Sequence, residues 1–206
     1  MNGVCINFTR RVTPEYILSS FGASAASLEE LTLERAPEAL GLPSDHSLVR
    51  AGTFGDWGFC IETFGTIAVR RDVLEGLSSE SHSITASCGA NALHVIANWQ
   101  NGEEVETFQP GHRPSLSAKS LHPLWDETEM VSSRYPGVSA IVAAFSAITE
   151  KTGVRIPFGL AAGPLLSGIA PMRDFSSCAP PVQKWESGAR TLGKQLPGLQ
   201  FPLASD

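Results

Sequence analysis

The chain has 206 residues, of which 42% are hydrophobic, and it carries a formal net charge of −6 at pH 7. This size and composition predict one domain with an ordinary apolar core, which needs neither disulfides nor a metal ion to fold. The negative charge argues against general nucleic-acid binding, because such binding depends on many lysines and arginines. The charge suits a basic partner, although mild acidity also simply favours solubility.

The cysteines and the apolar segments indicate where the protein resides. Cys5, Cys60, Cys88 and Cys178 are far apart and form no CxxC pair, and we expect no signal peptide, because residues 1–11 contain no apolar segment of sufficient length. The longest uncharged run near the end, residues 156–172, is interrupted by three prolines and three glycines, so it cannot span a membrane as a helix. We therefore expect a cytoplasmic protein with free thiols and no membrane association.

The first forty residues predict one strand and two helices. Residues 5–11 are expected to form a strand, and residues 13–22 a short helix that begins with a threonine N-cap and a proline. Residues 27–40 predict a second helix, because Ser27 and Glu30 have the spacing of a capping box.

The centre of the chain is rich in strand signals. Alternation in residues 57–64 predicts a strand with Trp57 on one face and Cys60 and Glu62 on the other. Residues 65–71 are expected to continue this strand or to pair with it. The next segments predict a short helix over 72–78 and a strand over 83–88.

A β-hairpin is predicted between residues 91 and 110. Asn101-Gly102 lies between two strand-like segments, which is a strong signal for a two-residue turn. If the ladder runs regularly from this turn, Ala97 faces Glu106 and His94 lies beside Gln109 on the opposite face.

The remainder of the chain predicts helices followed by a tail. Residues 114–131 are expected to be irregular or helical, and residues 138–153 form the clearest amphipathic helix. Beyond Met172 there is little periodicity and there are many turn residues. We therefore predict a single α+β domain over 1–172, with a mainly antiparallel sheet and flanking helices, and an irregular, extended or poorly ordered tail over 173–206.

The central motifs resemble an uncharacterised actinobacterial domain family. Its W-x-F-x-x-E-x-x-G strand is matched here by Trp57, Phe59, Glu62 and Gly65, and weaker motifs follow in the same order along the chain. The resemblance covers about residues 5–165. It implies an intact small domain, and it implies no activity.

The sequence contains no motif typical of a cofactor site or a metal site. The five histidines lack the HxH, HxxxH or HExxH spacing of metal ligands, and the glycine-rich fingerprints of nucleotide sites are absent. We expect no cofactor and no metal, although a site assembled from distant positions leaves no such motif.

Four residues are candidates for catalysis. Cys60 or Cys88 is a possible nucleophile if a histidine such as His94 lowers its pKa, but most free cysteines are small buried hydrophobic residues. His94 is more commonly a histidine bonded to a neighbour. Glu62 is either a general acid or base, or a buried carboxylate held by Arg70, Arg71 or the backbone N–H groups of a loop, and we favour the structural role.

Two classes of function remain open. The first is a binding or accessory protein, similar to an immunity protein, that docks a basic protein or a small molecule, with a homodimer as a further candidate assembly. It is supported by two acidic clusters, Glu103, Glu104 and Glu106, and Asp126, Glu127 and Glu129. Candidate ligand contacts are Trp57, Trp99 and Asn98.

The alternative is a small-molecule tailoring or cyclising enzyme with a pocket on the sheet around Glu62, Cys60 and His94. A closed sheet face favours binding, whereas a deep pocket lined by these three residues favours catalysis.

Overall fold

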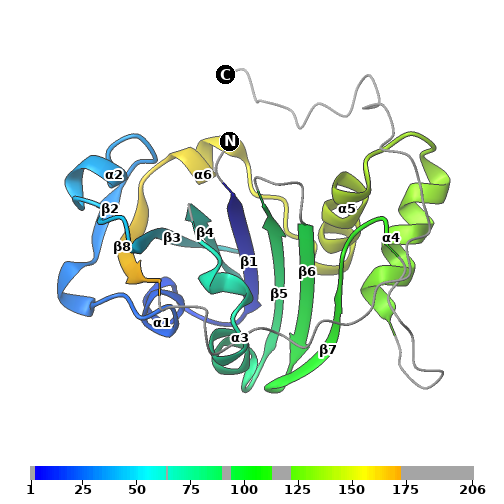
Figure 1. Ribbon diagram of the computed structural model, residues 1–206, viewed down its shortest axis with the longest axis horizontal. Coiled ribbons are helices and arrows are strands. Elements are labelled where there is room, and N and C mark those ends of the chain that lie inside the picture. Colours follow the sequence, from blue (N-terminus) through cyan, green and yellow to red (C-terminus); the bar gives the residue numbers. More distant parts are fainter. Residues whose placement is uncertain (1–2, 64, 90–93, 113–121, 173–206) are drawn as a thin grey trace.

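The computed structural model describes residues 3–63, 65–89, 94–112 and 122–172. Its centre is one antiparallel eight-stranded sheet in the order β2-β8-β3-β4-β1-β5-β6-β7 (Figure 1). The strands are β1 (Val4–Arg10), β2 (Glu29–Leu31), β3 (His46–Phe54), β4 (Trp57–Thr63), β5 (His82–Cys88), β6 (His94–Gln100), β7 (Glu103–Phe108) and β8 (Leu165–Pro171).

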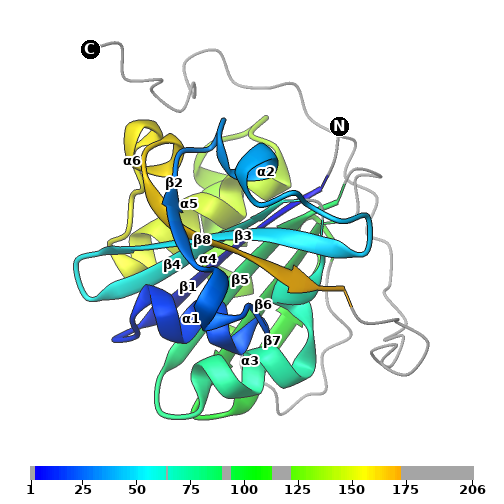
Figure 2. The same ribbon diagram turned by 90° about the vertical axis from the view of Figure 1, so that its left-hand side faces the viewer.

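Helices cover both faces of this sheet (Figures 1 and 2). They are α1 (Pro14–Ser20), α2 (Ala36–Ala39), α3 (Arg71–Ser78), α4 (Pro123–Arg134), α5 (Ala140–Thr152) and α6 (Phe158–Ala162), with short 3-10 helices η1 (Ala25–Ser27) and η2 (Ile67–Val69). α4 and α5 pack on one face, and α1, η2 and α3 pack on the other. The α+β class predicted from the sequence is therefore confirmed.

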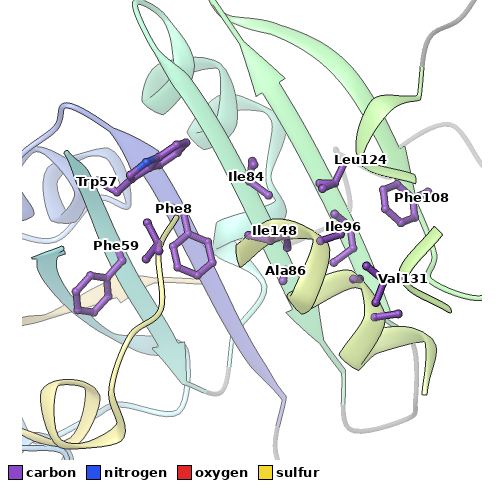
Figure 3. Packing of buried hydrophobic residues seen from close by; sticks show 14 of the residues in the cluster. Phe8, Trp57, Phe59, Ile84, Ala86, Ile96, Phe108, Leu124, Val131 and Ile148 are labelled. Atoms are coloured by element: carbon purple, nitrogen blue, oxygen red, sulfur yellow. The ribbon is translucent and has the colours of Figure 1, made fainter. Parts of the chain in front are cut away.

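Strand alternation divides the core into two layers. On the α4/α5 face, aromatic and branched side chains from the central strands meet the two helices in one large cluster (Figure 3). Figure 3 shows Trp57 and Phe8 beside each other on β4 and β1 at one side of this cluster. On the α1/α3 face, Cys60 and Val49 pack against η2 and the two helices. The alternation predicted for residues 57–63 is thus confirmed.

The last described strand, β8, is the second strand from one edge of the sheet. β8 lies between β2 and β3, so the chain returns from α5 to its N-terminal region. Arg50 of β3 is fully buried, and its guanidinium donates hydrogen bonds to the carbonyls of Leu31, Ala161 and Gly163. These hydrogen bonds hold the segment before β8 and the end of β2 against β3. The boundary predicted at residue 172 stays a prediction, because the tail over 173–206 lies outside the described residues.

Several local predictions are confirmed. Thr13 caps α1 by accepting a hydrogen bond from the Tyr16 N–H. Asn101 and Gly102 both have positive φ, at 54° and 78°, as the two-residue hairpin turn requires. α5 ends at Gly153 in the left-handed conformation. The buried residues of α5 are Ile148 and three alanines, Ala143, Ala144 and Ala147.

The helix predicted over residues 27–40 is wrong. Glu29–Leu31 form strand β2, and only Ala36–Ala39 are α-helical. Leu31 is buried opposite Leu165 of β8, so pairing at the sheet edge outweighs the capping-box signal. β3 and β8 themselves were not predicted as strands.

The strand predicted over residues 65–71 is also wrong. This segment forms η2 and the beginning of α3. The cause is Glu62, whose carboxylate accepts hydrogen bonds from the N–H groups of Ile67 and Ala68 and therefore holds them out of any ladder.

The regular hairpin register is wrong beyond its first pairs. Trp99 does face Glu104, but a β-bulge follows, with Val105 as the extra residue, and Asn98 then faces Glu106. The bulge turns Glu106 from the α3 side of the sheet to the α4 side. The predicted pair of His94 and Gln109 is absent as well, because β7 ends at Phe108 and His94 faces Cys88 of β5.

Candidate functional site: a cleft and the polar chain behind it

A cleft of about 530 Å³ opens on the α4/α5 face, where the β3–β4 turn meets the end of α5. Four elements surround it: the end of β1, the β3–β4 turn, the start of β5 and the C-terminus of α5. Its lining residues are Arg10, Phe54, Gly55, Asp56, Trp57, His82, Lys151, Thr152, Gly153 and Val154. The Trp57 and His82 rings pack edge to face, with their centroids 5.6 Å apart, and so form one wall.

A buried carboxylate lies behind this wall. Glu106, which is only 2% exposed, accepts hydrogen bonds from the N–H groups of Leu124 at 2.8 Å and Trp125 at 3.1 Å. These are orphan donors of the first turn of α4, where the helix dipole also favours a negative charge. Asn98 Nδ2 donates a third hydrogen bond, at 2.8 Å. The three donors together fix the position of the carboxylate.

Asn98 connects this carboxylate to the cleft. Its Oδ1 lies 2.7 Å from His82 Nε2, and its own exposure is 2%. The orientation of the amide follows from the network, since an ionised carboxylate can only accept and the Asn98 NH₂ group must therefore point to Glu106. The Asn98 carbonyl oxygen then faces His82, so Nε2 must carry a proton.

Two cations act on His82 from the rim of the cleft. Burial lowers the pKa of His82 below its ordinary value, and the positive charges of Lys151 and Arg10 act in the same direction. The Asn98 hydrogen bond and the Glu106 charge oppose this decrease. The net effect favours a neutral imidazole at neutral pH.

Glu62, the carboxylate singled out from the sequence, lies on the opposite face and is fully buried. Its oxygens accept the N–H groups of Ile67 at 2.9 Å and Ala68 at 2.8 Å. Burial raises its pKa, against the effect of these hydrogen bonds. The prediction that Glu62 is buried and satisfied by local partners is confirmed. That it performs no chemistry stays a prediction.

The other catalytic candidates do not gather around Glu62. Cys60 shares its face and is fully buried, whereas Cys88 and His94 are cross-strand neighbours on the α4/α5 face. Burial raises the pKa of the Cys60 and Cys88 thiols, and it raises that of Cys5 to about 12. The described thiols are therefore protonated, which is unfavourable for a nucleophile.

The three candidate ligand contacts are distributed over both faces. Trp57 lines the cleft, and Asn98 lies directly behind it. Trp99 lies on the α3 side, with the Arg71 guanidinium 5.6 Å from its ring centroid. Sequence reasoning missed His82, Arg10 and Lys151, because no motif joins them. It also placed Glu106 in an acidic surface cluster, whereas the bulge buries this residue.

A second cleft, of about 470 Å³, lies on the α1 side of the molecule. Its lining is mostly small and apolar, with Glu15 and Tyr16 as its titratable groups. Among the described residues, no group of three or more His, Cys, Asp or Glu side chains is arranged to hold a metal ion. No helix in the described part of the chain is long and apolar enough to cross a membrane.

The first three quarters of the chain match a known protein family. Residues 1–156 match the family of unknown function DUF6461. The chain belongs to this family. The matched segment contains Arg10, Trp57, His82 and Lys151 of the cleft together with Asn98 and Glu106, while α6 and β8 follow it. No curated protein and no solved structure shows significant similarity to the chain.

Proposed function

We propose that this protein is a binding protein whose cleft beside Trp57 and His82 holds a small acidic molecule. One observation carries the proposal: Arg10 and Lys151 both line the cleft, and neither forms an ion pair with any other described residue. Asp56 is the one carboxylate among the described lining residues, so this part of the cleft has an excess of positive charge within a chain of net charge −6. Such a local excess attracts anions.

The dimensions and the surroundings of the cleft support a small molecule. A volume of about 530 Å³ lies within the usual range for ligand sites, and an aromatic wall with a few polar groups is the usual lining. Docking of a basic protein on the hairpin has less support than the sequence indicated. Glu106 is buried, which leaves Glu103 and Glu104 as the exposed carboxylates of that cluster.

Binding is favoured over catalysis by the positions of the candidate residues. Glu62 and Cys60 are sealed under η2 and α1, and His94 lies on the other face, so no pocket joins the three. We further propose a cytoplasmic location, which is supported by Cys5, Cys60 and Cys88 being free thiols.

The test is a titration followed by two-dimensional NMR, with benzoate and inorganic phosphate as anionic probes and benzylamine as a cationic counterpart. We expect the anions to shift the resonances of Trp57, His82 and Gly153. Arg10→Gln combined with Lys151→Gln should weaken anion binding at least about tenfold, the scale of one lost hydrogen bond to a charged group.

Arg35→Gln is the matched control, because it removes an exposed positive charge outside the cleft. It should leave the affinity unchanged. Shifts that map to another surface, stronger binding of benzylamine, or equal anion affinity in the double variant would each contradict the proposal.

A further inference from the structure

We infer that His82 is the specificity-determining residue of the cleft, and that it selects small acids that also carry a hydrogen-bond donor such as a hydroxyl group. The inference rests on the proposed binding function. It concerns the chemical group that the cleft recognises in addition to the negative charge. Its basis is the chain of hydrogen bonds that runs from α4 to the cleft wall.

The first step is the anchoring of Glu106. Its carboxylate is held by two successive N–H groups at the start of a twelve-residue helix, so its position is set by the backbone of α4. Oε1 accepts from both Leu124 and Asn98, and Oε2 accepts from Trp125. A carboxylate in this position has no proton to donate, and this fixes the direction of every further hydrogen bond.

The second step is the choice of the His82 tautomer. Because the Asn98 NH₂ group is committed to Glu106, its carbonyl oxygen must accept from His82 Nε2. A neutral imidazole with a proton on Nε2 has an unprotonated Nδ1. Among the described residues, none hydrogen-bonds to Nδ1, while His82 itself lines the cleft. Nδ1 is therefore the ring atom available to accept a hydrogen bond from a ligand.

The third step concerns protonation. An imidazolium has no acceptor, so the site works only if His82 stays neutral. Desolvation of the ring and the charges of Arg10 and Lys151 favour the neutral form. The same two cations would bind the acidic group of the ligand. A molecule that satisfies both features carries an acidic group and an O–H or N–H donor.

The experiment compares matched probes with and without a hydroxyl donor. The probes are the 2-, 3- and 4-hydroxybenzoates, the corresponding methoxybenzoates, and benzoate. In the wild-type protein we expect at least one hydroxybenzoate to bind about fivefold or more tightly than its methoxy partner, the scale of one net hydrogen bond. His82→Phe keeps an aromatic ring beside Trp57 and should abolish this preference while benzoate still binds.

His46→Phe is the control, because His46 lies outside the cleft at the start of β3. It should keep the hydroxyl preference. Long-range ¹H–¹⁵N NMR of the wild-type protein tests the tautomer without any substitution, and we expect the proton on Nε2.

The possible failures are distinguishable. If no anion binds in the cleft, the proposed function fails and this inference fails with it. If benzoate binds there but hydroxyl and methoxyl probes bind equally well, or if the His82 proton is on Nδ1, the inference is overturned and the proposed function remains.

Discussion

Glu62 and Glu106 are two buried carboxylates with the same local geometry on opposite faces of one sheet. Each accepts hydrogen bonds from two successive backbone N–H groups at the start of a helix, η2 for Glu62 and α4 for Glu106. They differ in what lies behind them. Glu62 is enclosed by the α1/α3 side of the core, whereas Glu106 is connected through Asn98 to His82 and the cleft.

The comparison shows that burial and hydrogen bonding do not by themselves identify a functional carboxylate. Both groups satisfy orphan donors of a helix, and both therefore contribute to stability. The difference is the direction in which the network continues. The Glu62 network is enclosed in the core. The Glu106 network continues through Asn98 to His82, which lines the cleft, and can therefore act on the protonation of that ring.

The largest expected effect is the loss of stability in a variant that disrupts the surroundings of Glu62 and leaves those of Glu106 intact. A Cβ at Gly65 would clash with Glu62 Oε1 and would lie 2.5 Å from Ser47 Oγ, while the Glu62 carboxylate is fixed by its backbone donors. Gly65→Ala should therefore lower the free energy of unfolding by about 3 kcal/mol or more. Urea denaturation measures this, with Gly76→Ala in α3 as the control.

A Cβ at Gly76 meets no atom within 4 Å, and the residue lies inside a helix. The control should therefore be neutral or more stable by about 0.5–1 kcal/mol. Equal stabilities of the two alanine variants would mean that the Glu62 site is not packed as described.

The second prediction separates the two carboxylates directly. Glu62→Gln and Glu106→Gln each replace one acceptor oxygen by an NH₂ group that faces a backbone N–H, so each should lower the free energy of unfolding by about 1–3 kcal/mol. Only Glu106→Gln also removes a negative charge that raises the pKa of His82. An NMR titration of His82 should therefore give a lower pKa in Glu106→Gln and the wild-type pKa in Glu62→Gln. The connection between Glu106 and the cleft is disproved if the two variants titrate alike.

The third prediction concerns the turn that precedes the bulge. Gly102 has a φ of 78° and its N–H donates to the Ser78 carbonyl, which fastens the hairpin to the end of α3. Gly102→Ala should cost about 1–2 kcal/mol, because an L-residue is strained at this φ. If the turn sets the position of Glu106, the His82 resonances should shift as well. A destabilised variant with unchanged His82 resonances would show that α4 alone holds Glu106 in place.

Sequence reasoning predicted the elements whose signals are local. The alternation around Glu62, the Asn101-Gly102 turn and the glycine end of α5 each depend on a few adjacent residues. The bulge at Val105 does not, because it forms where the Glu106 carboxylate meets the N–H group of Leu124, 18 residues later in the chain. A regular ladder was the simplest prediction, and it placed this carboxylate on the wrong face.

The same limit explains the unpredicted site. His82 is an unremarkable residue at the start of a strand until Asn98, two positions before the end of the next strand, approaches it. Arg10 and Lys151 are 141 positions apart and meet only through the folded sheet. Glu62, in contrast, was predicted from its position in the strand to be buried and satisfied by local partners, and its N–H donors do follow it by only five and six residues.

The smallest expected effect is that the contributions of His82 and Glu62 to stability change in opposite directions as the pH rises. The pKa of His82 is lowered from its ordinary 6.5, so the unfolded chain binds a proton more readily than the folded protein. The neutral ring thus contributes stability that is fully present above pH 6.5 and is lost as the pH falls through the folded pKa. The pKa of Glu62 is raised from its ordinary 4.5, so the folded protein binds a proton more readily there. Its contribution is fully present below pH 4.5 and is lost as the pH rises.

Urea denaturation of wild type, His82→Phe and Glu62→Gln between pH 4 and 8 measures both contributions. The stability of wild type relative to His82→Phe should increase with rising pH up to about 6.5 and then level off. The stability of wild type relative to Glu62→Gln should decrease from about pH 4.5 upward. The charged groups that act on His82 are Lys151, Arg10 and Glu106, and those on the rim are unchanged in His82→Phe. If the two stability differences change with pH in the same direction, the folded protein shifts the pKa of His82 and the pKa of Glu62 in the same direction. The folded protein would then not keep His82 neutral.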